Sequence, residues 1–156
     1  MNSEDQKNII NQTKLIKDCK IAIVASPYYS KITSNLISGA IKVISSANII
    51  SEIFEVEGAL EIPGAISLIR KDFQGFVALG CVIRGETIHY EIVSQNSAMG
   101  LMQLSTQGLC IGNGIITVEN INQALERSDP NKKDKGGDAA RAAISLMSLR
   151  QEFYNN

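Results

Sequence analysis

The sequence predicts a three-layer α/β/α fold built on a four-stranded parallel sheet. The continuous apolar run at residues 21–25 predicts a strand covered on both faces, the run at 76–82 predicts a second buried strand, and residues 49–56 and 109–116 predict two further strands. Segments with apolar residues at helical spacing separate these runs, and two more follow the last run. The resulting order, βαβαβαβαα, is typical of a parallel sheet with helices on both faces.

The first half of the chain contains two strand-to-helix units. The strand at 21–25 ends at Ser26-Pro27, and apolar residues then recur at helical period from Ile32 to about Ala47. The strand at 49–56 leads into a helix from about Ala59 to Lys71. Pro63 suits the first turn of that helix, because the N–H that proline lacks has no partner there.

The second half begins with the strand at 76–82, after which we expect a helix from about Ile88 to Thr106. The strand at 109–116 contains Gly112 and Gly114. Glycine weakens a strand interior, and it marks either a bulge or a close neighbour, such as a flat ligand or another subunit. The remaining expected elements are a short helix at 118–127 that begins at Thr117 or Glu119, a charged loop at 128–134 and a helix at 137–153.

Length, composition and charge narrow the class of protein. A chain of 156 residues with 44% hydrophobic and 20% charged residues fits one soluble globular domain. We assign residues 1–17 to a polar N-terminal arm and residues 18–156 to that domain. The net charge of −1 argues against nucleic-acid and anionic-membrane partners, which require a basic surface. No segment resembles a signal peptide or a membrane span.

Three cysteines, Cys19, Cys81 and Cys110, are scattered along the chain. Their odd number and wide spacing argue against a disulfide scaffold, and with one histidine they provide no zinc ligand cluster. We expect small buried thiols in a reducing compartment, and therefore a cytoplasmic protein.

The carboxyl edge of the predicted sheet holds the residues best suited to chemistry, because open α/β sheets bind ligands there. His89, the only histidine, lies between the third strand and the following helix, and its side chain is suited to proton transfer near neutral pH. The preceding Arg84–Thr87 segment could hold a phosphate through backbone N–H groups, or Thr87 could be a simple helix N-cap. Arg127 and Lys135 are explained equally well as solvated cations, and Glu61 as a carboxylate that stabilises a helix dipole.

Several segments together resemble the lumazine synthase family, from about Lys20 to Phe153. VIRGETIH (Val82–His89) and ENINQALER (Glu119–Arg127) are highly specific motifs of this family. Further matches are Ile32–Ser34 with Ser38–Ala40, Gly58–Pro63, Leu79–Tyr90, Gly114–Asn120 and Lys135–Ala140. The resemblance implies a flavodoxin-like fold and a transferase that condenses 5-amino-6-(D-ribitylamino)uracil with 3,4-dihydroxy-2-butanone 4-phosphate. It implies no cofactor and no metal.

The resemblance also implies roles for individual residues. His89 becomes the general acid/base, and the butanone phosphate is held by Gly85, Glu86, Thr87 and Arg127. The ribitylaminouracil contacts are Tyr28, Ala59, Leu60, Glu61, Cys81, Val82, Ile83, Asn113 and Lys135. The site lies between two subunits of a pentamer, or of a decamer or shell made from pentamers. One subunit supplies His89 and the first three loops, and its neighbour supplies Asn113, Arg127 and Lys135.

Three positions depart from the common family pattern. Tyr28, with Tyr29 beside it, replaces the usual phenylalanine or tryptophan that stacks on the pyrimidine, so either tyrosine could stack. Asn113 replaces a phenylalanine and could offer its amide to the uracil. Asp134 replaces the asparagine before Lys135, and the lysine is kept.

Other functions of this architecture remain as alternatives. A response regulator needs acidic residues at the ends of the first and third strands, where Ser26 and Cys81-Val82 stand instead. A non-catalytic flavin- or lumazine-binding module would need a Ser/Thr/Gly-rich loop after the first strand. The related archaeal-type riboflavin synthase is the nearest enzymatic alternative, and the intact VIRGETIHY segment argues against it.

Overall fold

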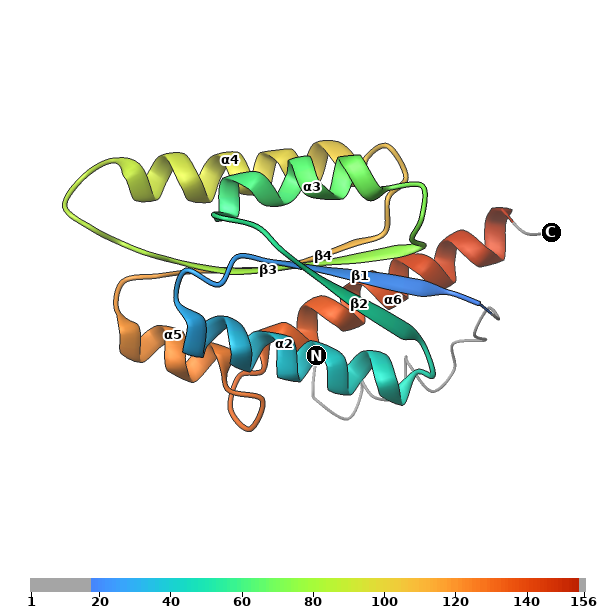
Figure 1. The fold of residues 1–156 in the computed structure, drawn as a ribbon, viewed down its shortest axis with the longest axis horizontal. Helices are drawn as coiled ribbons and strands as arrows, with labels where there is room; N and C mark the ends of the chain where they lie inside the picture. Colours follow the sequence, from blue (N-terminus) through green and yellow to red (C-terminus); the bar gives the residue numbers. More distant parts are fainter. Residues whose placement is uncertain (1–17, 155–156) are drawn as a thin grey trace.

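The predicted α/β/α architecture is confirmed in a computed structural model that describes residues 18–154. The N-terminal arm expected at residues 1–17 lies outside the described residues. Helices α3 and α4 cover one face of a parallel sheet, and α2, α5 and α6 cover the other (Figure 1). The strands, in the spatial order β2-β1-β3-β4, are β1 (Lys20–Ala25), β2 (Ile50–Glu55), β3 (Gly75–Ile83) and β4 (Ile111–Val118). The helices are α2 (Ser30–Ser46), the 3-10 turn η1 (Ala59–Glu61), α3 (Ile62–Ile69), α4 (His89–Ser105), α5 (Ile121–Ser128) and α6 (Lys135–Tyr154).

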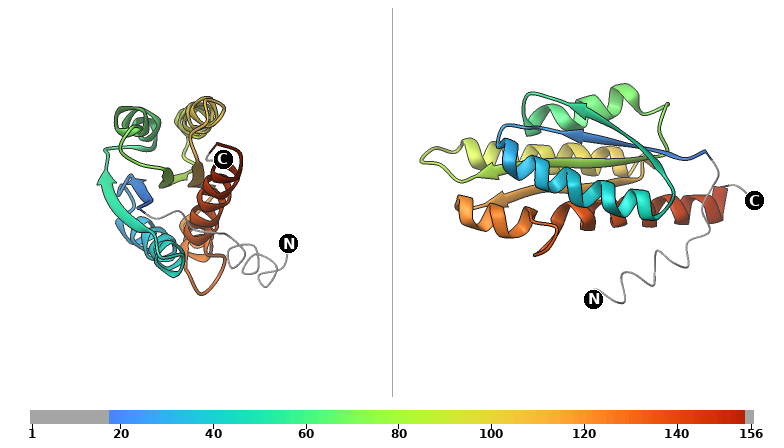
Figure 2. Two further views of the ribbon diagram at one scale, coloured as in Figure 1. Left: turned by 90° about the vertical axis from the view of Figure 1, so that its right-hand side faces the viewer. Right: turned by 60° about the horizontal axis from the view of Figure 1, so that its bottom comes forward.

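The central strand β3 divides the core into two layers. Val77 and Leu79 join the apolar cluster under α2 and α6, while Phe76 and Ala78 join the cluster under α3 and α4. The end-on view in Figure 2 places these helical layers on opposite sides of the sheet. Because both faces of β3 are covered, its sequence is a continuous apolar run rather than an alternating one.

Two helix starts differ from the sequence prediction. The short helix α5 begins at Ile121, not at residue 118, because β4 continues to pair with β3 as far as Val118. Asn120 caps α5, and its side-chain oxygen accepts a hydrogen bond from the Gln123 amide at 3.0 Å. The expected start at Thr117 or Glu119 is therefore wrong. Helix α6 begins at Lys135, two residues earlier than expected, and the Asp134 carboxylate accepts a bond from the Gly137 amide.

The glycines of β4 have a neighbour that the sequence did not suggest. The β3–β4 register runs without interruption from Phe76–Ile111 to Ile83–Val118, so β4 contains no bulge. A Cβ at Gly112 would lie 1.7 Å from the carbonyl oxygen of Ala139, and one at Gly114 would lie 3.0 Å from the Ala139 Cβ. The close neighbour in the direction of the missing side chains is thus α6 of the same chain.

The three cysteines are buried and free, as expected. Within residues 18–154, no helix has the length and apolar character needed to cross a membrane.

Candidate active site at the carboxyl edge of the sheet

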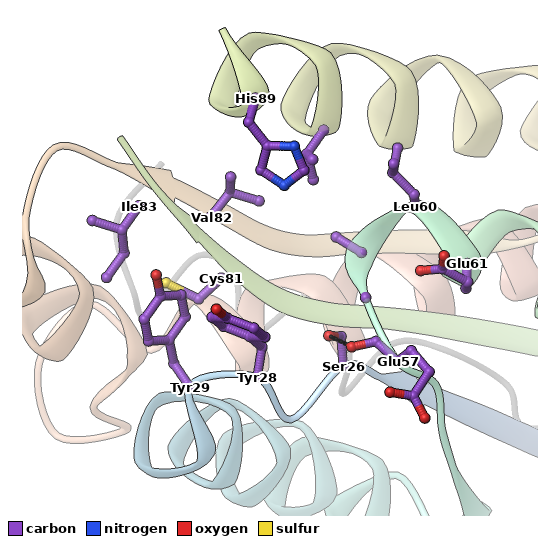
Figure 3. Close-up of a pocket in the computed structure, with 13 residues that line it drawn as sticks. Ser26, Tyr28, Tyr29, Glu57, Leu60, Glu61, Cys81, Val82, Ile83 and His89 are labelled. Atoms are coloured by element: carbon purple, nitrogen blue, oxygen red, sulfur yellow. Dashed lines mark hydrogen bonds between the residues drawn. The ribbon is translucent and has the colours of Figure 1, made fainter. Parts of the chain in front are cut away.

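A cavity of about 400 Å³ opens at the carboxyl ends of β1 and β3, which is the expected ligand edge of this fold (Figure 3). Its size lies within the range of small-molecule sites. Three loops and the start of α4 line it, through Ser26, Tyr28, Tyr29, Glu57–Glu61, Cys81–Ile83, His89 and Val93. Eight of the sequence-predicted site residues therefore share one cavity: Tyr28, Ala59, Leu60, Glu61, Cys81, Val82, Ile83 and His89.

His89 is the first residue of α4, and its side chain is exposed to the cavity. Figure 3 shows the imidazole pointing down from the helix toward Val82, with Leu60 to one side. The His89 backbone amide donates to Thr87 Oγ1 at 3.3 Å, while Ile88 holds the N-cap position of α4 and makes no side-chain capping bond, so Thr87 is not the N-cap. A titratable ring at this position can reach a substrate bound between the three loops.

Tyr28 and Tyr29 form the opposite wall, and their environments differ. Tyr28 is 78% exposed, whereas Tyr29 is half-buried and packs against the core under α2. Their ring centroids lie 5.0 Å apart in an edge-to-face arrangement. Burial, followed by proximity to Cys81 and Tyr28, raises the pKa of Tyr29. Tyr28 therefore presents the freer ring face to the cavity.

Ser26 joins the loops that form the floor of the cavity, and the sequence prediction missed this residue. Its backbone amide donates to the Leu79 carbonyl at 3.0 Å, and its hydroxyl donates to the Glu57 carbonyl at 3.2 Å. The Ser26 carbonyl accepts a bond from the Thr33 hydroxyl at 2.8 Å. These bonds link the end of β1 to β3, to the loop after β2 and to α2. Glu57, Gly58 and Val93 also line the cavity without having been predicted.

Cys81 forms a wall of the cavity and keeps its proton near neutral pH. Burial raises the pKa of its thiol to about 11. Since the thiolate is the nucleophilic form of cysteine, Cys81 has no nucleophile to offer at neutral pH. Cys81 therefore contributes to the shape of the cavity, together with the backbone groups at the end of β3.

The predicted phosphate loop, Gly85–Thr87, is exposed and connects β3 to α4 immediately before His89. A Cβ at Gly85 would have no atom within 4 Å, so the space beside the loop is open. The loop lies outside the lining of the cavity, on the solvent side of the His89 helix start.

Like the Gly85–Thr87 loop, three further predicted site residues lie outside the lining of this cavity. Asn113 is exposed in the middle of β4, where its Oδ1 accepts a bond from the Ile115 amide at 2.9 Å. Arg127 ends α5 and donates to the Gln123 carbonyl at 3.3 Å, and Lys135 pairs with Asp138 at 3.3 Å. None of the three is among the residues that line this cavity.

Comparison with known proteins identifies relatives that match most of the described range. The family model for 6,7-dimethyl-8-ribityllumazine synthase matches residues 18–151. The chain is 50% identical over 136 residues to a protein of that name from Novosphingobium aromaticivorans, covering 86% of this chain and 98% of the relative. A Zymomonas mobilis protein of the same name is 51% identical over 136 residues, which cover 86% and 98% of the two chains. A third, from Bartonella henselae, is 44% identical over 145 residues, which cover 90% and 94%.

Proposed function

The chain belongs to the 6,7-dimethyl-8-ribityllumazine synthase family, and from this premise we propose that the cavity below His89 is its active site. The protein is an enzyme of riboflavin biosynthesis, a transferase. It condenses 5-amino-6-(D-ribitylamino)uracil with 3,4-dihydroxy-2-butanone 4-phosphate to give 6,7-dimethyl-8-ribityllumazine, phosphate and water. The family match favours this activity over a flavin-binding module and over archaeal-type riboflavin synthase.

The position of His89 is the observation that carries the assignment of the site. The amine of the uracil attacks the ketone, phosphate leaves, and ring closure expels water, so each stage requires a proton to be moved. His89 lines the cavity and lies two residues after Thr87 of the Gly85–Thr87 loop, so one imidazole can serve both the reacting carbons and the departing phosphate. We assign His89 as the general acid/base.

The phosphate of the butanone substrate is assigned to the loop before His89. Gly85, Glu86 and Thr87 offer backbone N–H groups and the Thr87 hydroxyl at the N-terminus of α4, where the helix dipole favours an anion. The Glu86 carboxylate must point away, because a phosphate beside it would be repelled. Arg127 of a neighbouring subunit is the second anchor, since its guanidinium can bind phosphate with two parallel hydrogen bonds.

The ribitylaminouracil is assigned to the rest of the cavity. Tyr28 stacks on the pyrimidine, because its ring is the more exposed of the tyrosine pair. The ribityl chain is contacted by Ala59, Leu60 and Glu61. The edge of the pyrimidine is contacted by backbone groups of Cys81, Val82 and Ile83. A neighbouring subunit adds Asn113 and Lys135.

A pentamer, alone or in multiples, is the assembly that we propose for this single-domain protein in the cytoplasm. Helix α4 leaves Ile92, Met99 and Met102 exposed at 44%, 58% and 61%, although apolar side chains elsewhere on it are buried. A helix whose exposed face also carries apolar side chains needs a second surface to cover that face. Asn113 and Arg127 lie outside the cavity of their own chain, which supports a cyclic arrangement in which each subunit completes the next site.

Replacing Arg127 with alanine is expected to raise the KM for the butanone phosphate about 10- to 100-fold, since hydrogen bonds to a charged group are lost. The kcat at saturating substrate should change far less. Lumazine formation, followed by absorbance and fluorescence, gives both constants. Arg150→Ala is the matched control, because Arg150 bonds to the Gly108 carbonyl away from the cavity. An unchanged KM in Arg127→Ala would remove Arg127 from the phosphate site.

A further inference from the structure

Arg84 connects the proposed phosphate loop, Gly85–Thr87, to other segments of the chain. It is the residue directly before Gly85, and its backbone amide donates to the Val118 carbonyl at 2.9 Å, at the end of the β3–β4 ladder. Its position alone allows two roles: the guanidinium could bind the phosphate itself, or it could hold the loop that binds the phosphate.

The contacts of the guanidinium favour the second role. Nη1 of Arg84 lies 2.5 Å from Glu91 Oε1, and Nε lies 3.0 and 3.1 Å from the two carboxylate oxygens of Glu119. The guanidinium carbon also lies 4.3 Å from the centroid of the Tyr90 ring. Hydrogen bonds that Arg84 donates, first to Glu91 and then to Glu119, raise its pKa. Two carboxylates thus oppose a single cation, which leaves no net positive charge for a phosphate.

The carboxylates that hold Arg84 stand on ordered elements. Glu91 belongs to the first turn of α4, and its pKa is lowered by its own backbone amide and by Arg84. Glu119 directly precedes the Asn120 cap of α5, and its amide donates to the side-chain oxygen of Gln123 at 2.8 Å. Gln123 in turn donates its amide to Asn120 at 3.0 Å. Arg84 therefore connects the beginning of the Gly85–Thr87 loop to the starts of α4 and α5.

We propose that Arg84 is a positioning residue that holds the Gly85–Thr87 loop in the conformation that binds phosphate, and that it does not contact the phosphate. The inference rests on the proposed phosphate role of this loop. Arginine suits this role, because its planar guanidinium can bond to two carboxylates and contact the face of an aromatic ring in a fixed geometry. A Cβ at Gly85 would meet no atom within 4 Å, so nothing packs against that side of the loop.

The test compares Arg84→Gln with Glu119→Gln, which removes the partner and leaves the arginine in place. If Arg84 acts through Glu119, both changes raise the KM for the butanone phosphate. We expect about tenfold for Arg84→Gln and at least about threefold for Glu119→Gln, with kcat nearly constant, because a misplaced loop weakens phosphate binding. The KM of the double variant should equal that of Arg84→Gln, since both changes break the same interaction. Arg84→Lys keeps the charge and loses the planar guanidinium, so its KM for the butanone phosphate should lie between those of wild type and Arg84→Gln.

Two further variants make the outcome decisive. Arg70→Gln removes an arginine that bonds to Gln107 far from the cavity, and its constants should equal those of wild type. Thr87→Val tests the phosphate assignment of the loop itself: an unchanged KM there overturns that assignment and the inference together. A raised KM in Thr87→Val and Arg84→Gln, with an unchanged or lowered KM in Glu119→Gln, would mean that Arg84 binds the phosphate directly. Wild-type constants in Arg84→Gln, with a raised KM in Thr87→Val, would overturn the inference alone.

Discussion

His89→Ala is expected to lower kcat for lumazine formation by about 10²-fold or more, the contribution typical of a general acid/base. The chain has one histidine, and it lines the cavity. Histidine is the residue type most often used for general acid/base catalysis. The thiol of Cys81 cannot substitute, because its pKa of about 11 keeps it protonated. Initial rates at saturating concentrations of both substrates measure the effect.

His89→Gln provides the control for shape, because an amide fills similar space and cannot exchange a proton near neutral pH. Both variants should keep the oligomer size of the wild type, since the exposed imidazole is not part of the core. Wild-type kcat in a correctly assembled His89→Ala protein would exclude the histidine from the mechanism.

Gly112→Ala is expected to reduce the free energy of unfolding by about 3 kcal/mol or more, the upper range for overpacking a core. The added methyl group would meet the Ala139 carbonyl at 1.7 Å, and this neighbour is backbone that cannot rotate away. Relief requires β4 and α6 to separate. In a chain of this length the thermal midpoint should fall by about 10 °C.

Gly64→Ala is the matched control. Gly64 lies in α3, and a Cβ there would meet no atom within 4 Å. Its midpoint should stay constant or rise, because alanine favours a helix over glycine by about 1 kcal/mol. Thermal scans of all three proteins at one protein concentration keep any contribution from assembly comparable. Equal midpoints for Gly112→Ala and wild type would contradict the observed contact between β4 and α6.

The fold could be predicted from the sequence because its two central strands, β1 and β3, are apolar on both faces. The run Phe76–Val82 has no charged position that would allow another arrangement, and Gly75 marks its beginning. The tight packing of Gly112 on Ala139 could not be predicted, since it depends on how residues 27 positions apart meet in space. The bulge offered for Gly112 was wrong, because the β3–β4 register is continuous and the glycine instead makes room for the Ala139 carbonyl.

The candidate site could be predicted only in part. Residues at strand ends converge by topology, and this brought Tyr28, Leu60, Cys81 and His89 into one cavity. Ser26 was missed although it directly follows β1, because a small hydroxyl residue there gives no sign that it bonds to three other segments. For Asn113, Arg127 and Lys135 the roles rest on the family resemblance, because all three lie outside the cavity of their own chain.

Subunit mixing tests most directly the central claim that each active site combines His89 of one chain with Arg127 of the next. His89→Ala and Arg127→Ala proteins are dissociated, mixed in equal amounts and reassembled, and lumazine formation is measured at limiting butanone phosphate, where both parents are slow. In a random cyclic assembly about one quarter of the sites would receive both intact residues, so activity should rise to about a quarter of that of wild type. Activity no higher than the parental average, in oligomers verified to contain both variants, would contradict a shared site.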